Sequence, residues 1–438
     1  IGNLRTYIME DVLEKYLRYA GYDVTRAMNI TDVGHLTSDA DTGEDKMLKG
    51  ARREHKTVMQ IAQYYTDAFF ADCEKLNIKK PQIVVPATSC IPQFIHMIEA
   101  LLEKGYAYEA NGNIYFDTSK LENYYVFHNF DAEDLEVGVR EGVEADDSKR
   151  NKTDFVLWFT KSKFEDQELK WDSPWGVGYP GWHIECSAIS LTNLGEYLDI
   201  HCGGIDNAFP HHTNEIAQSE AYLGHPWCRY WFHVLHLNTA NGKMSKSKGE
   251  FLTVSLLEEK GYDPRAYRLF CLQSHYRRLL EFTWEGLDNA ATAYEKLTAK
   301  IAQLDKNAPA KPEDEAEAAR LRASFAAAMD NDLNTSLAVT ALYDVLKSAA
   351  SDGVKRQLLG EFDAVLSLSL LEAADKRSEA AVPAADGALT AKIEAMIAER
   401  AAAKKAKDYA RADAIRAELS AMGVTLKDTP SGTEYTIA

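Results

Sequence analysis

The hydrophobic positions at the start of the chain recur at helical spacing. In residues 5–22 one stripe collects Ile8, Val12, Leu13, Tyr16 and Leu17. This spacing predicts an amphipathic helix that ends near Gly21. Apolar and polar residues then alternate in residues 23–33, and a short apolar run follows at residues 81–90. Each of these segments predicts a strand, and helices in succession with strands favour an α/β layer.

The pattern changes between about residues 86 and 172. Two strand-like runs flank Asn111 and Gly112, a dipeptide that favours a tight hairpin turn. An acidic, loop-like stretch follows at residues 131–147. Strand and helix patterns alternate again from residue 181 to residue 238. We therefore interpret the intervening region as an insertion into one α/β domain.

The pattern beyond residue 289 is helical. Tyr294, Leu297, Ile301 and Leu304 follow the 3,4,3 spacing of one buried helix face. Residues 305–317 contain two prolines and predict a break between two helices. Residues 374–390 are rich in Ala and polar side chains and predict a linker. A small terminal domain with a helical pair is expected from residue 391 to residue 438.

Composition narrows the class of protein. A chain of 438 residues is too long for one core, so we expect about three domains. A net charge of −18 argues against a general nucleic-acid coat, and no apolar run approaches the ~20 residues that span a bilayer. Six cysteines in so long a chain do not predict a disulfide framework, which favours a reducing cytoplasm. The chain starts at Ile1 without an initiator Met, so we expect further residues upstream.

The sharpest chemical motif is GKMSKSKG at residues 242–249. Lys243, Lys246 and Lys248 lie there among small residues flanked by glycines. Such a loop can cover a triphosphate and stabilise the charge that develops as pyrophosphate leaves. A solvated basic turn is the alternative.

A second candidate nucleotide motif is HCGGIDNAFPHH at residues 201–212. Gly203 and Gly204 allow a flat ligand to approach the backbone closely. Asp206 can bind ribose hydroxyls, as acidic residues do in dinucleotide sites. Taken alone, this motif favours a plain turn.

A candidate metal site lies around FPHHTNEIAQ at residues 209–218. His211 and Glu215 are four residues apart, on one face if the stretch is helical. Cys186, in GWHIECSA upstream, offers a thiolate. Zinc binds all three donor types. In isolation, however, a single Cys is more often buried in a core, and a single HxxxE pattern more often lies on a solvated helix face.

Together these motifs resemble the cysteinyl-tRNA synthetase family of class I aminoacyl-tRNA synthetases. The resemblance covers essentially the whole chain and rests on NITDVGHLTSDADTGEDK, KRNKTDFVLWF, GWHIECSA, GGIDNAFPHHTNEIAQ, KMSKSKG, MDNDLNTSLA, KDYARADAIRAEL and TPSGTEY. It implies an α/β fold with a Rossmann-like catalytic domain, an insertion, a helical bundle and a small C-terminal anticodon-binding domain. The implied segments are the catalytic domain at 1–85 and 173–235, the insertion at 86–172, the KMSKS and stem-contact region at 236–288, the bundle at 289–373 and the anticodon-binding domain at 385–438.

The resemblance also implies a role for the metal. In this family two Cys, one His and one Glu hold a Zn²⁺ ion that binds the thiolate of the substrate cysteine. Cys186, His211 and Glu215 match three of these ligands. We expect the remaining Cys upstream of residue 1. One zinc per chain would then select the substrate.

Further site residues follow from the same resemblance. Thr31, Trp182 and His201 match the amino-acid pocket. The ATP site would take Lys246, Asp206, Gly203 and Gly204, together with Ile1, Gly2 and Asn3, which look like the tail of the HIGH signature. The histidine of that signature would lie just upstream. Lys243 and Lys246 would carry the chemistry at the phosphates. Cys202 and Thr213 stand where the family often has Gly and Glu, and neither is a matched ligand.

The implied activity is the ATP-dependent ligation of L-cysteine to cysteine tRNA through a cysteinyl-adenylate, with ATP and Mg²⁺ as substrate. We expect a cytoplasmic monomer without a membrane partner. Three alternatives stay open at this point: a related ligase that joins cysteine to an amino sugar, a zinc hydrolase with Glu215 as base, and a non-catalytic tRNA-binding fragment. KDYARADAIRAEL speaks against the first, and the absence of an HExxH pattern speaks against the second.

Overall fold

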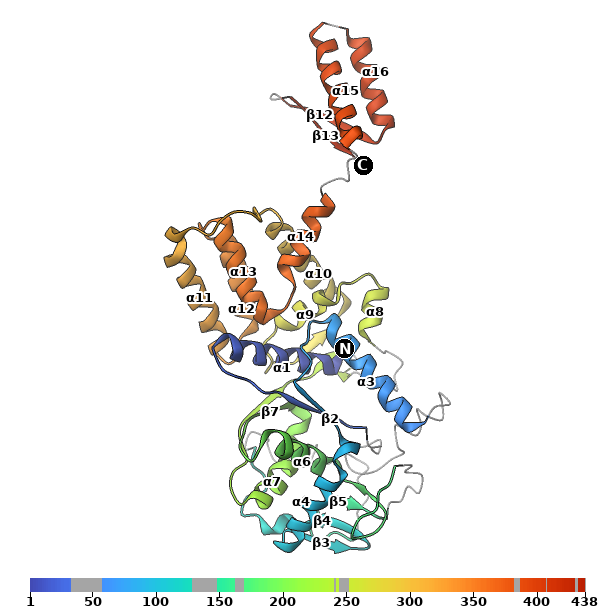
Figure 1. Cartoon of the computed structure of the whole chain (residues 1–438), viewed down its shortest axis with the longest axis vertical. Helices are drawn as coiled ribbons and strands as arrows, with labels where there is room; N and C mark the ends of the chain where they lie inside the picture. The colour runs from blue at the N-terminus through green and yellow to red at the C-terminus, as the bar shows by residue number, and fades with distance from the viewer. Residues whose placement is uncertain are drawn as a thin grey trace.

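The computed structural model describes most of the chain. The described residues are 1–32, 57–127, 148–161, 169–239, 242–243, 252–381, 387–406, 408–429 and 432–437. Figure 1 shows an elongated arrangement in which the α/β layers, the helical bundle and the C-terminal unit follow one another along the long axis. Among these residues, no helix combines the length and the apolar character that crossing a bilayer requires.

Among the described residues, two pairs of parallel strands form the α/β part. β1 (Ala27–Ile30) pairs with β2 (Ile83–Pro86), and β7 (Leu198–Gly204) pairs with β8 (Cys228–Val234). The helices around them are α1 (Gly2–Tyr19), α3 (Val58–Lys75), α4 (Ile91–Glu103), α6 (Trp182–Leu194) and α7 (Thr213–Leu223). Parallel strands with intervening helices are the Rossmann-like arrangement that the resemblance implies. The first helix and the first two strands lie where the periodicity places them.

The strands of the insertion belong to a sheet with the order β3-β4-β5-β6, whose last strand, β6, lies past the expected end of the insertion at residue 172. Its strands are β3 (Ala107–Ala110), β4 (Asn113–Phe116), β5 (Phe155–Phe159) and β6 (Tyr179–Pro180). The hairpin expected at Asn111 and Gly112 is confirmed, and both residues have positive φ, 50° and 84°. Those values are the ones that a two-residue hairpin turn of this class requires. Buried residues of the sheet share one core with α4 and α6.

A second small sheet connects the α/β part to the helical part. It has the order β10-β9-β11, formed by β9 (Leu237–Thr239), β10 (Gly242–Lys243) and β11 (Leu280–Phe282). Helices α8 (Val254–Glu259) and α9 (Pro264–Leu272) lie between β10 and β11 in the chain. Five short turns complete the described elements: η1 (Ala87–Cys90), η2 (Thr118–Lys120), η3 (Ile205–Asn207), η4 (Ala208–His212) and η6 (Pro312–Asp314).

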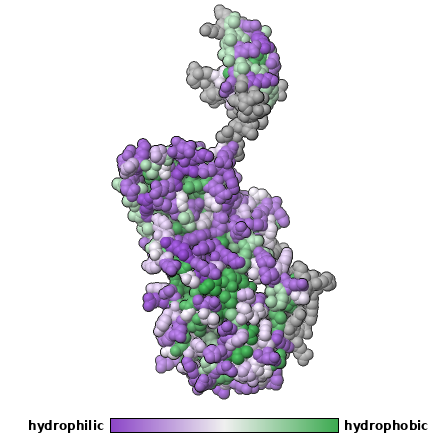
Figure 2. Space-filling view, in the orientation of Figure 1, coloured by the Kyte–Doolittle hydropathy of each residue, from purple (hydrophilic) through white to green (hydrophobic). Residues whose placement is uncertain are grey.

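Five helices form the bundle. They are α10 (Trp284–Ile301), α11 (Glu315–Asp330), α12 (Thr335–Lys347), α13 (Asp352–Leu366) and α14 (Leu370–Ala381). The predicted helix face at Tyr294, Leu297 and Ile301 is buried, and the predicted break between two helices is present. Figure 2 shows that polar residues predominate on the visible face of the bundle, whereas apolar residues gather below α1.

The predicted linker is wrong over its first half. Residues 374–381 belong to α14 rather than to a linker. Leu370 and Ala374 are 0% exposed in the bundle core, and this burial holds the helix despite its polar composition. Residues 382–386 lie outside the described part of the chain. The next helix, α15, begins at Gly387.

The C-terminal unit has its own core. The expected helical pair is α15 (Gly387–Lys405) and α16 (Tyr409–Ala421), and a hairpin of β12 (Val424–Thr429) and β13 (Gly432–Ile437) follows. Its buried apolar residues form a separate cluster of Ile393, Ile415, Leu419, Val424 and Leu426. In Figure 1 this unit lies beyond α14, at the far end of the bundle.

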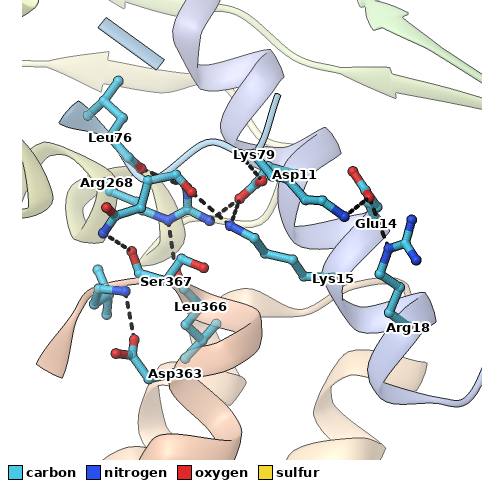
Figure 3. A network of polar contacts seen from close by, with 12 residues as sticks. Asp11, Glu14, Lys15, Arg18, Leu76, Lys79, Arg268, Asp363, Leu366 and Ser367 are labelled. Carbon is cyan, nitrogen blue, oxygen red and sulfur yellow. Dashed lines mark hydrogen bonds and ion pairs between the residues drawn. The ribbon is translucent and has the colours of Figure 1, made fainter. Parts of the chain in front are cut away.

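A buried polar network joins α1 to the bundle (Figure 3). Arg268 of α9 is 0% exposed and donates to Asp11 Oδ2 at 2.6 Å, to Leu76 O at 2.9 Å and to Leu366 O at 2.7 Å. Asp11 also accepts from Lys15 Nζ at 2.7 Å. One guanidinium therefore links α1, the end of α3 and the end of α13.

Candidate active site

The candidate site residues come together at the carboxyl ends of the parallel strands. Thr31 follows β1, and His201 lies in β7. Trp182 and Cys186 lie one turn apart at the start of α6. Ligand sites of open α/β sheets lie at this edge.

The three candidate metal ligands form one group. The donor atoms of Cys186, His211 and Glu215 all lie within 4.8 Å of one another. His211 Nε2 is 3.0 Å from Glu215 Oε1, and both residues are almost completely buried. The backbone between them is not one regular helix, because Phe209 interrupts η4 with an extended conformation and α7 begins at Thr213. The two side chains nevertheless meet.

The electrostatics of the group suit a cation. Burial by itself raises the pKa of Glu215, but His201 and His211 beside it hold that pKa well below its usual range. Burial raises the pKa of the Cys186 thiol well above its usual range, and the carboxylates of Glu215 and Glu185 add to this effect. A metal ion is what would favour the thiolate in such surroundings. A thiolate, an imidazole and a carboxylate are donors that zinc accepts. The residues present therefore fit the ion.

His201 lies closer to the metal group than the sequence suggests. Its Nε2 atom is 3.2 Å from Glu215 Oε2, and its side chain is 17% exposed. His201, His212 and Glu215 form a second group whose donor atoms lie within 4.8 Å of one another. The residue that the resemblance assigns to the amino-acid pocket thus touches a carboxylate assigned to the metal.

The other two residues of the predicted pocket also border the metal group. The ring of Trp182 stacks on that of His211, with centroids 4.0 Å apart and planes inclined by 27°. Thr31 Oγ1 accepts from Asn29 Nδ2 at 3.3 Å, and the same amide lies 3.5 Å from Cys186 Sγ. Asn29 is a contact that the sequence analysis missed.

His183 is a second missed residue. Its Nδ1 atom lies 2.8 Å from His211 Nδ1, and the side chain is buried against Phe155. A hydrogen bond at Nδ1 leaves His211 Nε2 directed at Glu215, which orients the ring for a ligand. The position of His183, three residues before Cys186 on one helix, is a signal that the sequence did offer.

The predicted ATP residues are placed only in part. Gly203 and Gly204 end β7, where a Cβ atom on Gly203 would lie 2.8 Å from His212 Cε1 and one on Gly204 would lie 2.6 Å from Asp206 Oδ1. The glycines thus permit close approach of the protein's own side chains. Asp206 is exposed in η3.

The two signature segments also lie near each other. The main-chain nitrogen of Ile1 donates to Leu252 O at 2.6 Å, and Gly2 and Asn3 open α1. The backbone of Lys243 belongs to β10. The side chain of Lys243 and the whole of Lys246 lie outside the described part of the chain.

Comparison with known proteins establishes the class first. Residues 1–292 match the family model of the tRNA synthetases class I (C) catalytic domain. Residues 324–369 match the DALR domain, and residues 386–435 match the cysteinyl-tRNA ligase anticodon binding domain. A solved methionyl-tRNA synthetase from Mycobacterium tuberculosis, bound by methionyl-adenylate, has the same fold, with a TM-score of 0.55, 14% identity and 85% of this chain covered against 86% of that chain. The fold and the matched models thus define a class I synthetase.

Curated relatives identify the family within this class of synthetases. The cysteine--tRNA ligase of Treponema denticola is 43% identical over 99% of this chain and 92% of its own length. That of Borrelia turicatae is 44% identical with the same coverage. The chain belongs to the cysteine--tRNA ligase family of class I tRNA synthetases. The family and the enzyme class expected from the sequence are confirmed, and the three alternatives are not favoured.

Proposed function

We propose that this chain ligates L-cysteine to cysteine tRNA in two steps, through a cysteinyl-adenylate, and that its metal group reads the substrate sulfur. The observation that carries the second part is the meeting of Cys186, His211 and Glu215 at one buried point. These three residues would hold a Zn²⁺ ion. When bound, the ion supplies a soft Lewis acid that prefers a thiolate to a hydroxyl.

The surrounding side chains prepare the site for a small substrate. Trp182 covers one face of His211 and limits the access of water to it. His201 faces Glu215 from the partly exposed side, where the amino acid would enter. Thr31 accepts a hydrogen bond from Asn29 and is the last polar side chain in this series. Serine differs from cysteine by one atom, and a simple pocket separates such near-isosteres by only about a hundredfold. Direct reading of the sulfur explains selection without an editing site.

The nucleotide chemistry is assigned to the two signature segments. Lys243 and Lys246 would place ammonium groups on the phosphates of Mg²⁺-bound ATP and stabilise the leaving pyrophosphate. Residues 1–3, Gly203 and Gly204 would also bind ATP, and Asp206 would hold the ribose. Positioning of cysteine against the α-phosphate supplies the remaining acceleration. Residues 385–438 would bind the anticodon, and we expect the protein to act as a cytoplasmic monomer.

Cobalt substitution in the natural full-length protein tests the reading of sulfur. Cobalt accepts the same tetrahedral ligands as zinc and absorbs visible light. Addition of cysteine should produce a new sulfur-to-metal charge-transfer band, and addition of serine should not. Cys186→Ser should weaken metal binding and cysteine binding together. Cys73→Ser, on α3 and outside the group of donor atoms, should retain both. Cysteine that is adenylated without changing the cobalt spectrum would show that the metal is only structural.

A further inference from the structure

Arg5, in the first turn of α1, is buried against backbone oxygens. The residue is 1% exposed. Nη1 donates to Leu235 O at 2.6 Å and to His236 O at 2.7 Å. Nη2 donates to Arg278 O at 2.7 Å and to His275 O at 3.2 Å. One guanidinium therefore holds four main-chain carbonyls that come from two separate connections.

Both connections lead into the sheet that carries the start of the lysine motif. Residues 235–236 join β8 to β9, and residues 275–278 lie between α9 and β11. β9 is the middle strand of this sheet and pairs with β10, where Gly242 lies opposite Thr239. By holding these four carbonyls, Arg5 fixes where β9 and β11 begin. β9 pairs directly with β10, and β11 lies on the other side of β9.

The chain is held to the same helix end on the far side of the motif. Leu252 follows GKMSKSKG, and its carbonyl accepts from the main-chain nitrogen of Ile1 at 2.6 Å. The Tyr267 hydroxyl donates to Ile1 O at 2.9 Å. Described residues on both sides of the lysine motif are therefore attached to residues 1–5.

We propose that Arg5 is a positioning residue for adenylate formation: it sets where β10, at which the lysine motif begins, stands relative to the start of α1. This inference rests on the proposed function, in which these two segments act on one ATP molecule. Arginine suits the role because its planar fork directs several donors at once, whereas the lysine ammonium is a point charge on a flexible stem. A misplacement of about 1 Å between reacting groups can lower a rate about a hundredfold.

The decisive variant is Arg5→Lys in the natural full-length protein. It keeps the charge but cannot reach both connections in one geometry. Single-turnover adenylation should slow by roughly ten- to a hundredfold. Cysteine affinity and zinc content should stay within about twofold of the parent, because Arg5 contacts neither Cys186 nor Glu215 in the described structure.

Arg268→Lys is the matched control for lost stability. Arg268 is equally buried and also holds two carbonyls, but they belong to the ends of α3 and α13 and not to the connections that lead into the β9 sheet. This variant should lose stability and keep the adenylation rate. Tyr267→Phe is a milder second test, since it removes the hydroxyl that donates to Ile1 O and keeps the buried ring. It should slow adenylation by a few fold in a protein that still folds, and so decides the matter if Arg5→Lys does not fold.

The outcomes separate the inference from the function on which it rests. A parent protein without cysteine-dependent pyrophosphate exchange would overturn the proposed function. If the parent is active, equal slowing in Arg5→Lys and Arg268→Lys would reduce Arg5 to a structural residue. A loss of cysteine affinity in proportion to the rate, or an unaltered rate in Tyr267→Phe when Arg5→Lys is unfolded, would also overturn the inference.

Discussion

The buried pair of Asp11 and Arg268 allows a quantitative test of how firmly α1 is held to the bundle (Figure 3). Both side chains are 0% exposed, and Asp11 Oδ2 lies 2.6 Å from Arg268 Nη2. In Asp11→Ala the guanidinium stays buried without its carboxylate, and Lys15 loses the same acceptor. Breaking a buried pair in this way typically costs about 3–5 kcal/mol. That is a large share of the roughly 5–15 kcal/mol that stabilises a domain.

Amide hydrogen exchange of peptides from α1 and α13 is the suitable assay, because a chain of several domains does not unfold in one step. A cost of about 3–5 kcal/mol corresponds to exchange faster by roughly two to four powers of ten. Arg320→Met is the control, since Arg320 and Glu317 form an exposed pair at 2.7 Å. Exposed pairs of this kind often contribute nothing measurable.

Two further results would refute the reasoning. In the double variant Asp11→Ala, Arg268→Met, the replacement of Arg268 should cost less stability than it does in the parent, because no unpaired charge is left. Strictly additive losses of stability would contradict the coupling. The pH dependence gives the other check. Burial raises the pKa of Asp11, but Arg268 and Lys15 hold it below its ordinary 3.8. The stabilisation is therefore complete above that value and is lost as pH falls through the folded pKa, a loss that Asp11→Ala should not show.

Three other predictions concern function in the natural full-length protein. Lys246→Ala should slow adenylation by about a hundredfold to a thousandfold in single-turnover assays while cysteine affinity stays unchanged; the opposite pattern would contradict its assignment to the phosphates. Removal of zinc with a chelator should weaken cysteine binding, measured by calorimetry, far more than ATP binding, and re-addition should restore it. Deletion of residues 385–438 should weaken tRNA binding and spare pyrophosphate exchange, because their core is separate; loss of exchange in a folded protein would contradict this.

Several elements of the fold could be predicted from local sequence patterns alone. The helix stripe from Ile8 to Leu17 and the hairpin at Asn111 are properties of short segments, so periodicity and turn chemistry suffice to find them. Donor types alone suggested Cys186, His211 and Glu215 as a metal site without favouring it over a core Cys and a solvated helix face, since the thiolate is 25 residues away from the nearest other ligand in the chain, and the resemblance decided for the metal site.

The features that could not be predicted from the sequence depend on contacts between residues that are far apart in the chain. Arg5 looks like an ordinary helix residue until the carbonyls of residues 235–278 surround it. Ala374 reads as linker until the bundle buries it, and local composition carries no sign of that burial. The β12–β13 hairpin was missed because its strands mix polar and apolar residues and gain their support from α16.

The core that receives α1 has a consequence for synthesis on the ribosome. Leu4, Ile8 and Val12 belong to the same buried cluster as Leu366 and Leu368. Ribosomes add roughly 5–20 residues per second, so the two ends of this cluster are made roughly 20–70 seconds apart. During that interval the first helix emerges without its final partners, while the insertion, whose core draws on residues 87–221, can already assemble. The nascent chain can therefore complete the core of residues 87–221 before α1 is buried, and the apolar stripe of α1 stays open to chaperones during that interval.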